Sequence, residues 1–501
     1  MADYLADLCF THVSNTILSI FPRSTFMHWM RTCTDKCQNE RMVLYAVLGL
    51  GSLFAEEHVR DFGKSCARVA SDAVAGQSGN YHMCVVQTRL LVGLYLFAKG
   101  RYGLAQEYMG SAVRGSTNAL LCLNTETGCL DDASSRSHSR YEFSLSPAQL
   151  AECKRRTFWS CFTMELYDDS TASSVALQDI FLRLPSIDDD YERGLPSEAP
   201  FYNNGIVDSA STILTPSSPV SPMARLVLII AIWSDVRNFT NRAIHRPDST
   251  YREAYEAQYA ETHAQLTGWS TRLPGYLQYN ETNLDRSIHG GYAGTFITMH
   301  ALYHFVLIRL NRYVRHTQMP ESMPRNIRHA HYHAQTVLSV MGAVRNARRE
   351  TLNPSTGRRT NFALVVPFIG QVTMSAIDVV GAGGLDSNIG ATLEVIEGGL
   401  VCLRELSRYW NSALEQLREC ERRYYQIQNV LSRPYKARSG AWLGREWGLK
   451  DPLEKEFIQL GHDCIYADDG GGDGYTRTYF DALRDTVREQ PSPAGQHVRI
   501  A

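Results

Sequence analysis

Apolar residues recur at helical spacing along almost the whole chain, whereas strict alternation between apolar and polar residues is nearly absent. This pattern predicts an all-α protein. The stretches 84–98 and 104–123 are both apolar at this spacing, and only Lys99, Gly100 and Arg101 separate them. So short a connection predicts an antiparallel helical hairpin. We therefore expect an irregular multi-helix array of stacked antiparallel hairpins.

Two helix starts are explicit in the sequence. Ser146 can cap a helix that begins at Pro147, and Gln149 three residues after the cap completes a capping box. Ser221 followed by Pro222 predicts a second start of the same kind. Further helices are expected at 42–54, 300–314, 362–380 and 403–431.

Polar and proline-rich segments divide the chain. Residues 124–144 are polar and rich in serine, and residues 184–219 hold several prolines among serines and acids. We predict a core at 1–190 with a central helix at 147–170, a Pro/Ser-rich linker at 191–220, a C-terminal helical half at 221–490 packed on the first, and a flexible tail at 491–501.

Composition excludes several classes of protein. With 501 residues and 44% hydrophobic content, the chain can bury a large core and is not a disordered protein. A net charge of -2 lacks the basic excess typical of a nucleic-acid-binding surface, so no direct contact with nucleic acid is expected. The most apolar run, 42–55, is too short to span a bilayer, and we expect no membrane segment.

The twelve cysteines are scattered through the chain, and the first residues include Asp3 and Asp7 instead of a secretion signal. This favours an intracellular protein with free thiols, most of them small core residues.

Residues 152–162, Glu-Cys-Lys-Arg-Arg-Thr-Phe-Trp-Ser-Cys-Phe, resemble the signature helix of the fungal transcription factor regulatory domain. This domain is also called the xylanolytic-activator regulatory domain, the middle homology region of zinc-cluster transcription factors. Residues 87–95 followed by 110–114 are similar to the paired helices that precede the signature, and residues 182–185 followed by acids are similar to its exit. The resemblance implies a helical regulatory domain and a nuclear protein, or one shared between cytoplasm and nucleus.

The chain departs from this family pattern in three places. Glu165-Leu166 stands where the family usually has Asp-Arg, and Val175-Ala176-Leu177 stands where it has Gly-Arg-Pro. A binuclear zinc cluster needs two Cys-x-x-Cys pairs among six cysteines, and no two cysteines here have that spacing. We expect the chain to act without its own zinc-cluster DNA reader, as a natural truncation or because an upstream exon was missed.

The signature helix itself predicts a buried strut. Phe158, Trp159 and Phe162 extend apolar surface around the helix, so it should be enclosed on nearly all sides. Arg155 and Arg156 would then need partners, because an unpaired buried charge is costly. Glu165 or Asp168 could supply one, and we favour a structural ion pair over a catalytic role.

The histidines suggest two possible sites. His300 and His304 are four apart, which places both rings on one helix face and suits a metal pair, but packing is favoured because no glutamate follows His300. His329, His331 and His333 lie in a polar stretch and are interpreted as a solvated helix face. We expect no metal and no cofactor.

Two functions follow from this reading. The leading hypothesis is a transcription regulator that binds a small-molecule effector or a partner protein, either a zinc-cluster transcription factor or a second copy of the chain. The alternative is an enzyme of fungal secondary metabolism that uses an inter-helix cavity as its active site. A third interpretation is an inert fragment of a longer factor. The candidate acid–base residues of the enzyme are Glu165, Asp168, Asp169, His300, Tyr303 and His304.

Overall fold

The structure of the protein is a computed structural model of the full chain. It describes residues 1–14, 18–120, 142–164, 177, 180–203, 214–315, 318–347, 350–352, 359–361, 366–383 and 389–431.

The N-terminal half consists of short and medium helices. They are α1 (Ala2–Cys9), α2 (Arg23–Thr32), α3 (Gln38–Gly51), α4 (Glu57–Ala75), α5 (Met83–Ala98), α6 (Tyr102–Leu120), α7 (Pro147–Thr163) and α8 (Asp188–Arg193). A π-helical turn, Phe10–Ser14, follows α1, and the 3-10 turns of this half are η2 (Ser52–Phe54) and η5 (Glu142–Ser144).

The C-terminal half has longer helices. They are α9 (Pro222–Ala243), α10 (Asp248–Thr271), α11 (Glu281–His289), α12 (Ala293–Arg312), α13 (Met323–Asn346), α14 (Phe368–Gly383), α15 (Ile389–Leu406) and α16 (Asn411–Leu431). Two 3-10 turns, η8 (Gly275–Leu277) and η9 (Pro320–Ser322), precede α11 and α13. The strands β1 (Glu350–Leu352) and β2 (Arg359–Asn361) pair antiparallel, with Thr351 opposite Thr360.

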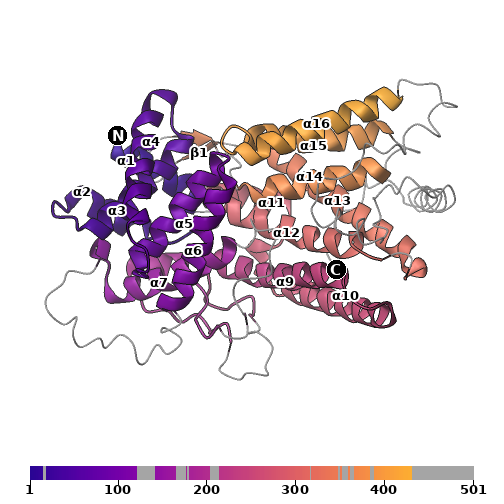
Figure 1. Ribbon diagram of the computed structural model, residues 1–501, viewed down its shortest axis with the longest axis horizontal. Coiled ribbons are helices and arrows are strands. Elements are labelled where there is room, and N and C mark those ends of the chain that lie inside the picture. Colours follow the sequence, from indigo (N-terminus) through magenta and orange to yellow (C-terminus); the bar gives the residue numbers. More distant parts are fainter. Residues whose placement is uncertain are drawn as a thin grey trace.

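The predicted all-α class is confirmed, and the described β-hairpin is a minor addition to it. Helices that follow one another in the chain pack together as α3 with α4, α5 with α6, α9 with α10, α12 with α13 and α15 with α16. Figure 1 shows the first half on one side of the molecule and the layered helices α9 to α16 on the other. One continuous hydrophobic core runs through both halves, from Leu5 to Cys420.

Glycines allow two of the tight helix contacts in the first half. The α5–α6 connection turns at Gly100, whose φ of +73° is a left-handed conformation that favours glycine. Gly49 of α3 faces α4 so closely that an added Cβ would lie 2.7 Å from the Cβ of Ala67. The predicted α5–α6 hairpin is present, with the predicted short connection.

The single helix expected at 403–431 is wrong. The chain leaves the helix after Leu406 and begins α16 at Asn411, although no glycine or proline lies between them. At this break Trp410 is 2% exposed and its ring lies 6.4 Å from that of Phe97 on α5. Burial of this side chain against the first half accompanies the break, and such a long-range contact is invisible to helical periodicity.

The Pro/Ser-rich segment is packed in several places where the structure describes it. Tyr191, Tyr202, Leu214 and Val220 are buried. The backbone N–H of Tyr202 donates to the carbonyl of Leu182 at 2.8 Å, beside an isolated bridge between Arg183 and Phe201. These described parts therefore combine buried side chains and backbone hydrogen bonds with exposed residues such as Leu195.

The described cysteines are free thiols, and most of them are buried, as predicted. Helix α12 is long and apolar enough to cross a membrane by composition alone, but 94% of its apolar window is buried inside the protein. It packs against α9, α13 and α14. This is the position of a central core helix.

Candidate functional site

Helix α7, the predicted signature helix, begins with the expected capping box. The hydroxyl of Ser146 accepts the Gln149 N–H at 3.2 Å, and Gln149 Oε1 accepts the Ser146 N–H at 3.1 Å. The Gln149 amide also donates to the hydroxyl of Thr25 on α2 at 3.0 Å. The cap thus orders the start of α7 and joins it to a distant helix.

The body of α7 is a buried strut, which confirms the sequence prediction. Phe158, Trp159 and Phe162 are at most 1% exposed. The indole N–H of Trp159 donates to the carbonyl of Arg183 at 2.8 Å, and its ring lies 5.4 Å from that of Tyr202. The described helix ends at Thr163, so the rest of the range predicted as 147–170 lies largely outside the described residues.

A single carboxylate on α7, that of Glu152, holds both buried arginines. Its Oε2 lies 2.8 Å from Arg155 Nη2, and its Oε1 lies 2.9 Å from Arg156 Nε. Oε1 also accepts the backbone N–H of Ser186 at 2.9 Å. Arg156 Nη1 reaches Asp188 of α8 at 2.8 Å. We call these residues, Glu152, Arg155, Arg156, Ser186 and Asp188, the Glu152 network.

The Glu152 network includes a partner of the arginines that the sequence prediction did not name. Glu165 and Asp168 were expected to supply the charge, and both lie outside the described residues, as does Asp169. The observed partner, Glu152, lies one helical turn before the arginines, where side chains share a face. The preference for a structural ion pair agrees with the contacts of Glu152, and the expected partners Glu165 and Asp168 stay a prediction.

Electrostatics keep the Glu152 network charged. Burial alone would raise the pKa of Glu152, but Arg156 and Arg155 together hold that pKa below its ordinary value. Burial would likewise lower the pKa of Arg156, but Asp188 and Glu152 raise it. Because the charged forms of both groups are stabilised, neither gains or loses a proton near neutral pH, and they are unsuited to acid–base catalysis. The network therefore acts as a structural clamp.

The other predicted candidates lie on the core helix α12. His300 is 5% exposed, and its Nε2 lies 2.9 Å from the carbonyl oxygen of Leu277. The ring of Tyr303 lies 6.0 Å from that of Trp269. His304 is 7% exposed and meets another histidine instead of His300. Among the described residues, no hydrogen bond joins these three side chains to a carboxylate.

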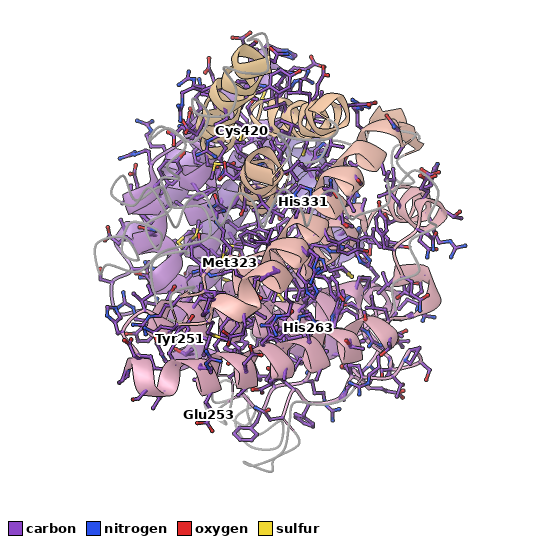
Figure 2. All side chains as sticks on the ribbon, turned by 90° about the vertical axis from the view of Figure 1, so that its right-hand side faces the viewer. Tyr251, Glu253, His263, Met323, His331 and Cys420 are labelled. Atoms are coloured by element: carbon purple, nitrogen blue, oxygen red, sulfur yellow. The ribbon has the colours of Figure 1, made fainter. Side chains whose placement is uncertain are left out.

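The interpretation of His329, His331 and His333 as a solvated face is wrong. His331 and His333 are only 4% and 9% exposed, because α13 packs against α12 on one side and against α14 and α15 on others. Figure 2 shows His331 on α13 above α10, which carries Tyr251 and His263. The polar residues around these histidines suggested an exposed helix, but α13 is covered by several other helices.

These histidines belong to a group of rings from three helices, which we call the histidine cluster. Its members are Tyr259 and His263 on α10, His304 on α12, and His329 and His333 on α13. The Nδ1 atoms of His304 and His333 lie 2.9 Å apart, and the Tyr259 hydroxyl lies 3.0 Å from His329 Nδ1. The His263 and His329 rings are 6.1 Å apart, and the His329 and His333 rings are 6.4 Å apart.

Burial makes the histidine cluster uncharged at neutral pH. It lowers the pKa of His304 to about 3, with a smaller effect from His300, and it lowers that of His300 to about 4. Burial also lowers the pKa of His333, and His304, His329 and His263 lower it further. A neutral imidazole offers one donor and one acceptor. Among the described residues, His263 Nε2 is buried with no hydrogen-bond partner.

Comparison with known proteins gives the context of these two sites. The chain matches the fungal specific transcription factor domain over residues 9–269. It belongs to that family. It is also 25% identical over 328 residues to an uncharacterized transcriptional regulatory protein of Schizosaccharomyces pombe (strain 972), covering 63% of this chain and 32% of that relative. The alignment therefore spans about a third of the length of the relative. No solved structure matches.

The fungal specific transcription factor domain includes only one of the two sites in full. Glu152, Arg156 and Asp188 lie within the matched residues. The match ends at residue 269, so the histidine cluster has Tyr259 and His263 inside it and its α12 and α13 members outside. The match that identifies the family therefore includes the strut α7 and its partners, but not helices α12 and α13.

Sequence reasoning missed two groupings. His263 and Tyr259 are about seventy residues from their α13 partners, since Tyr259 and His329 differ by 70 positions, and no local pattern joins them. His82, Cys84 and Glu142 form the described group of potential metal ligands, with ligand atoms within 4.8 Å of one another. This set has only one cysteine, so a search for paired cysteines does not find it. The spacing His82-x-Cys84 at the start of a helix could have indicated two of its three ligands.

Proposed function

We propose that this transcription regulator responds to an effector that binds its helical body at the histidine cluster. The family match and the transcriptional regulatory relative support a role in transcription. The observation that carries the effector proposal is a group of uncharged imidazoles between three helices, with His304 and His333 buried and His263 and His329 half-buried. Binding sites for small molecules combine apolar walls with a few polar groups that fix the ligand.

The chemistry of the cluster favours a small polar effector. His263 Nε2 has an unused hydrogen-bonding position among the described residues, and Tyr303 and Trp269 supply adjacent aromatic surface. An effector that contacts α10, α12 and α13 together would favour one packing of these helices over another. A zinc-cluster transcription factor or a second copy of this chain is the alternative ligand, and we propose a nuclear location for either case.

A reporter assay tests the regulatory part of this proposal. The full chain is fused to a bacterial DNA-binding domain and expressed in yeast with a matching reporter. We expect transcription to differ from that with the DNA-binding domain alone, and to change about fivefold or more between growth media. Unchanged transcription in every medium would refute the proposal. A deletion strain with altered metabolites but unaltered transcripts would favour the enzyme hypothesis instead.

A binding assay tests the location. A metabolite extract of low molecular mass is added to the purified chain, and thermal unfolding and hydrogen exchange are measured. We expect a higher melting temperature and slower exchange in α10, α12 and α13. The double variant His304→Phe, His333→Phe should lose this response, whereas His58→Ala, at an exposed histidine beside Glu56, should keep it. Slower hydrogen exchange only in other helices would place the effector site elsewhere. Light scattering would show whether the chain binds a second copy of itself.

A further inference from the structure

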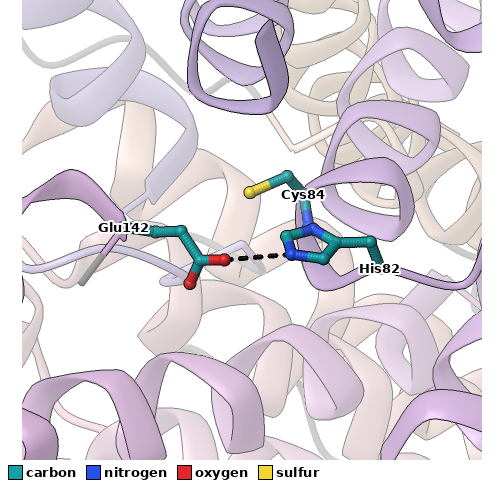
Figure 3. A group of neighbouring side chains, drawn as sticks. All are labelled: His82, Cys84 and Glu142. Atoms are coloured by element: carbon teal, nitrogen blue, oxygen red, sulfur yellow. Dashed lines mark hydrogen bonds and ion pairs between the residues drawn. The ribbon is translucent and has the colours of Figure 1, made fainter. Parts of the chain in front are cut away.

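Three side chains with different metal-binding atoms converge at the start of α5. His82 is the N-cap residue of this helix, Cys84 lies in its first turn, and Glu142 lies on the distant turn η5. Their ligand atoms all lie within 4.8 Å of one another. Figure 3 shows the carboxylate of Glu142 directed at the His82 ring, with the thiol of Cys84 beside it, and the His82 Nε2 to Glu142 Oε1 distance is 3.0 Å.

The backbone holds Glu142 in this position. The next residue, Phe143, donates its N–H to Glu40 Oε1 at 3.0 Å, and its buried ring packs against Trp29 at 5.0 Å. Phe143 and Ser144 both have left-handed backbone conformations, with φ of 56° and 54°. The turn is therefore fixed by a hydrogen bond and by aromatic packing, and Glu142 does not depend on His82 for its placement.

The three ligand atoms suit zinc. Thiolate sulfur, imidazole nitrogen and carboxylate oxygen are the ligands that Zn²⁺ binds, at about 2.0–2.3 Å, so ligand atoms of one tetrahedral ion lie about 3.3–3.7 Å apart. The nitrogen and oxygen are already near that separation. A thiolate and a carboxylate would balance the double charge of the ion. The His82 and Glu142 side chains are 39% and 27% exposed, so an ion can enter from solvent.

We propose that His82, Cys84 and Glu142 bind a Zn²⁺ ion, with water in the fourth position. Binding replaces the S–H bond of Cys84 with an S–Zn bond and releases that proton to solvent. The backbone N–H of Cys84 donates to His82 Nδ1 at 3.3 Å, so the ring proton resides on Nε2. Zinc replaces the proton on Nε2, and that proton is released to solvent. Nδ1 then binds a proton, so it no longer accepts the hydrogen bond from the Cys84 N–H. The balance is a release of about one proton per ion.

Such an ion would fasten two segments that the sequence keeps apart. Glu142 lies four residues before Ser146, the cap of α7, and His82 begins α5. The ion would therefore fix the entry to the strut against the α5–α6 hairpin. This site differs from a zinc-cluster DNA reader, which needs six cysteines. It is also independent of the histidine cluster, so the two proposals can fail separately.

Cobalt substitution tests the site directly. The full chain is treated with a chelator and titrated with Co²⁺, which reports a thiolate ligand through a sulfur-to-cobalt charge-transfer band. We expect the band to saturate near one equivalent and to disappear when Zn²⁺ is added. Cys84→Ser should abolish it, and Glu142→Gln should weaken binding about tenfold or more. The absence of the band in the parent chain, or its persistence in Cys84→Ser, would overturn the proposal.

Matched controls separate ligation from folding. Cys66→Ser changes another buried thiol, on α4, and should leave the band unchanged. His58→Ala removes an exposed histidine that also faces a glutamate, and should leave cobalt affinity unchanged. Because Glu142 is partly exposed, we expect Glu142→Gln to fold, so this variant still tests the site if Cys84→Ser does not fold. Circular dichroism measures the helical content of each variant. Unaltered cobalt affinity in folded Glu142→Gln would contradict the assigned ligand set.

Discussion

The Glu152 network and the histidine cluster bury polar side chains in opposite ways. On α7, charge is retained, because Glu152 faces Arg155 and Arg156, and Arg156 also reaches Asp188. In the histidine cluster the imidazoles themselves carry no charge, because burial lowers their pKa values. A charged network fixes one arrangement of its partners, whereas neutral imidazoles can exchange donors and acceptors. The Glu152 network is thus built as a clamp, and the histidine cluster keeps groups that a ligand could use.

The comparison predicts that the strut region tolerates change least. Trp159→Ala should lower the free energy of unfolding by about 3–5 kcal/mol, because it empties a fully buried site. It also removes the hydrogen bond to Arg183. Denaturant titration gives the value from the shift of the midpoint. A loss below about 1 kcal/mol would show that α7 is not the central strut.

Removal of the shared acid should cost somewhat less. Glu152→Gln preserves the size of the side chain but removes the carboxylate charge that pairs with Arg155 and Arg156, and we expect a loss of about 2–4 kcal/mol. Glu421→Gln is the matched control, because Glu421 pairs with Arg404 near the surface. Its effect should stay below about 1 kcal/mol. Equal losses in the two variants, measured by denaturant titration, would contradict the clamp.

Acid should loosen the second half first. The pKa values of His300 and His331 are lowered from 6.5 to about 4 by burial. Below about pH 6.5 the unfolded chain therefore binds more protons than the folded one, and stability falls with pH, by about 1.4 kcal/mol per histidine for each pH unit. The pKa of Glu152 is lowered instead, so its contribution persists to lower pH.

Hydrogen exchange can resolve the acid response by helix. Near about pH 5, amides of α13 should lose protection while those of α7 keep it. The double variant His304→Phe, His333→Phe removes two of the titrating groups and should flatten the pH dependence, whereas His58→Ala, at an exposed position, should not. Simultaneous loss of protection in both helices would show that the halves do not differ in this way.

Surface charge should matter least. Arg31 and Asp3 form an ion pair at 2.7 Å, but their side chains are 57% and 58% exposed. Water screens such pairs, so Arg31→Ala should change the free energy of unfolding by less than about 0.5 kcal/mol. Thermal unfolding of the parent chain and of Arg31→Ala measures this change in the free energy of unfolding. A change as large as that of Glu152→Gln would remove the distinction between buried and exposed charge on which the comparison depends.

Sequence reasoning succeeded where structure is determined locally. The capping box at Ser146 and Gln149 and the hairpin around Gly100 depend on residues within one or two turns. Glu152 could have been found in the same way, because side chains three and four positions apart share a helix face. The preference for an acid on the far side of the arginines overlooked that rule.

The errors concern contacts between distant segments. The helix break before Asn411 accompanies the packing of Trp410 against α5, far away in sequence. His331 and His333 of α13 are buried because this helix packs against α12, α14 and α15, although its sequence is polar. Periodicity records which face is apolar, but it does not record how many neighbours a helix will have.

The contact between Trp159 and Tyr202 has a practical consequence for preparing parts of this protein. A fragment that stops near residue 190, where the proline-rich stretch begins, would leave the indole face of the strut open to water. It would also remove the Arg183–Phe201 bridge beside that face. Exposed aromatic surface of this kind promotes self-association. Shortened versions should therefore keep the chain through α10, whose Trp269 donates its indole N–H to the carbonyl of Arg225 on α9.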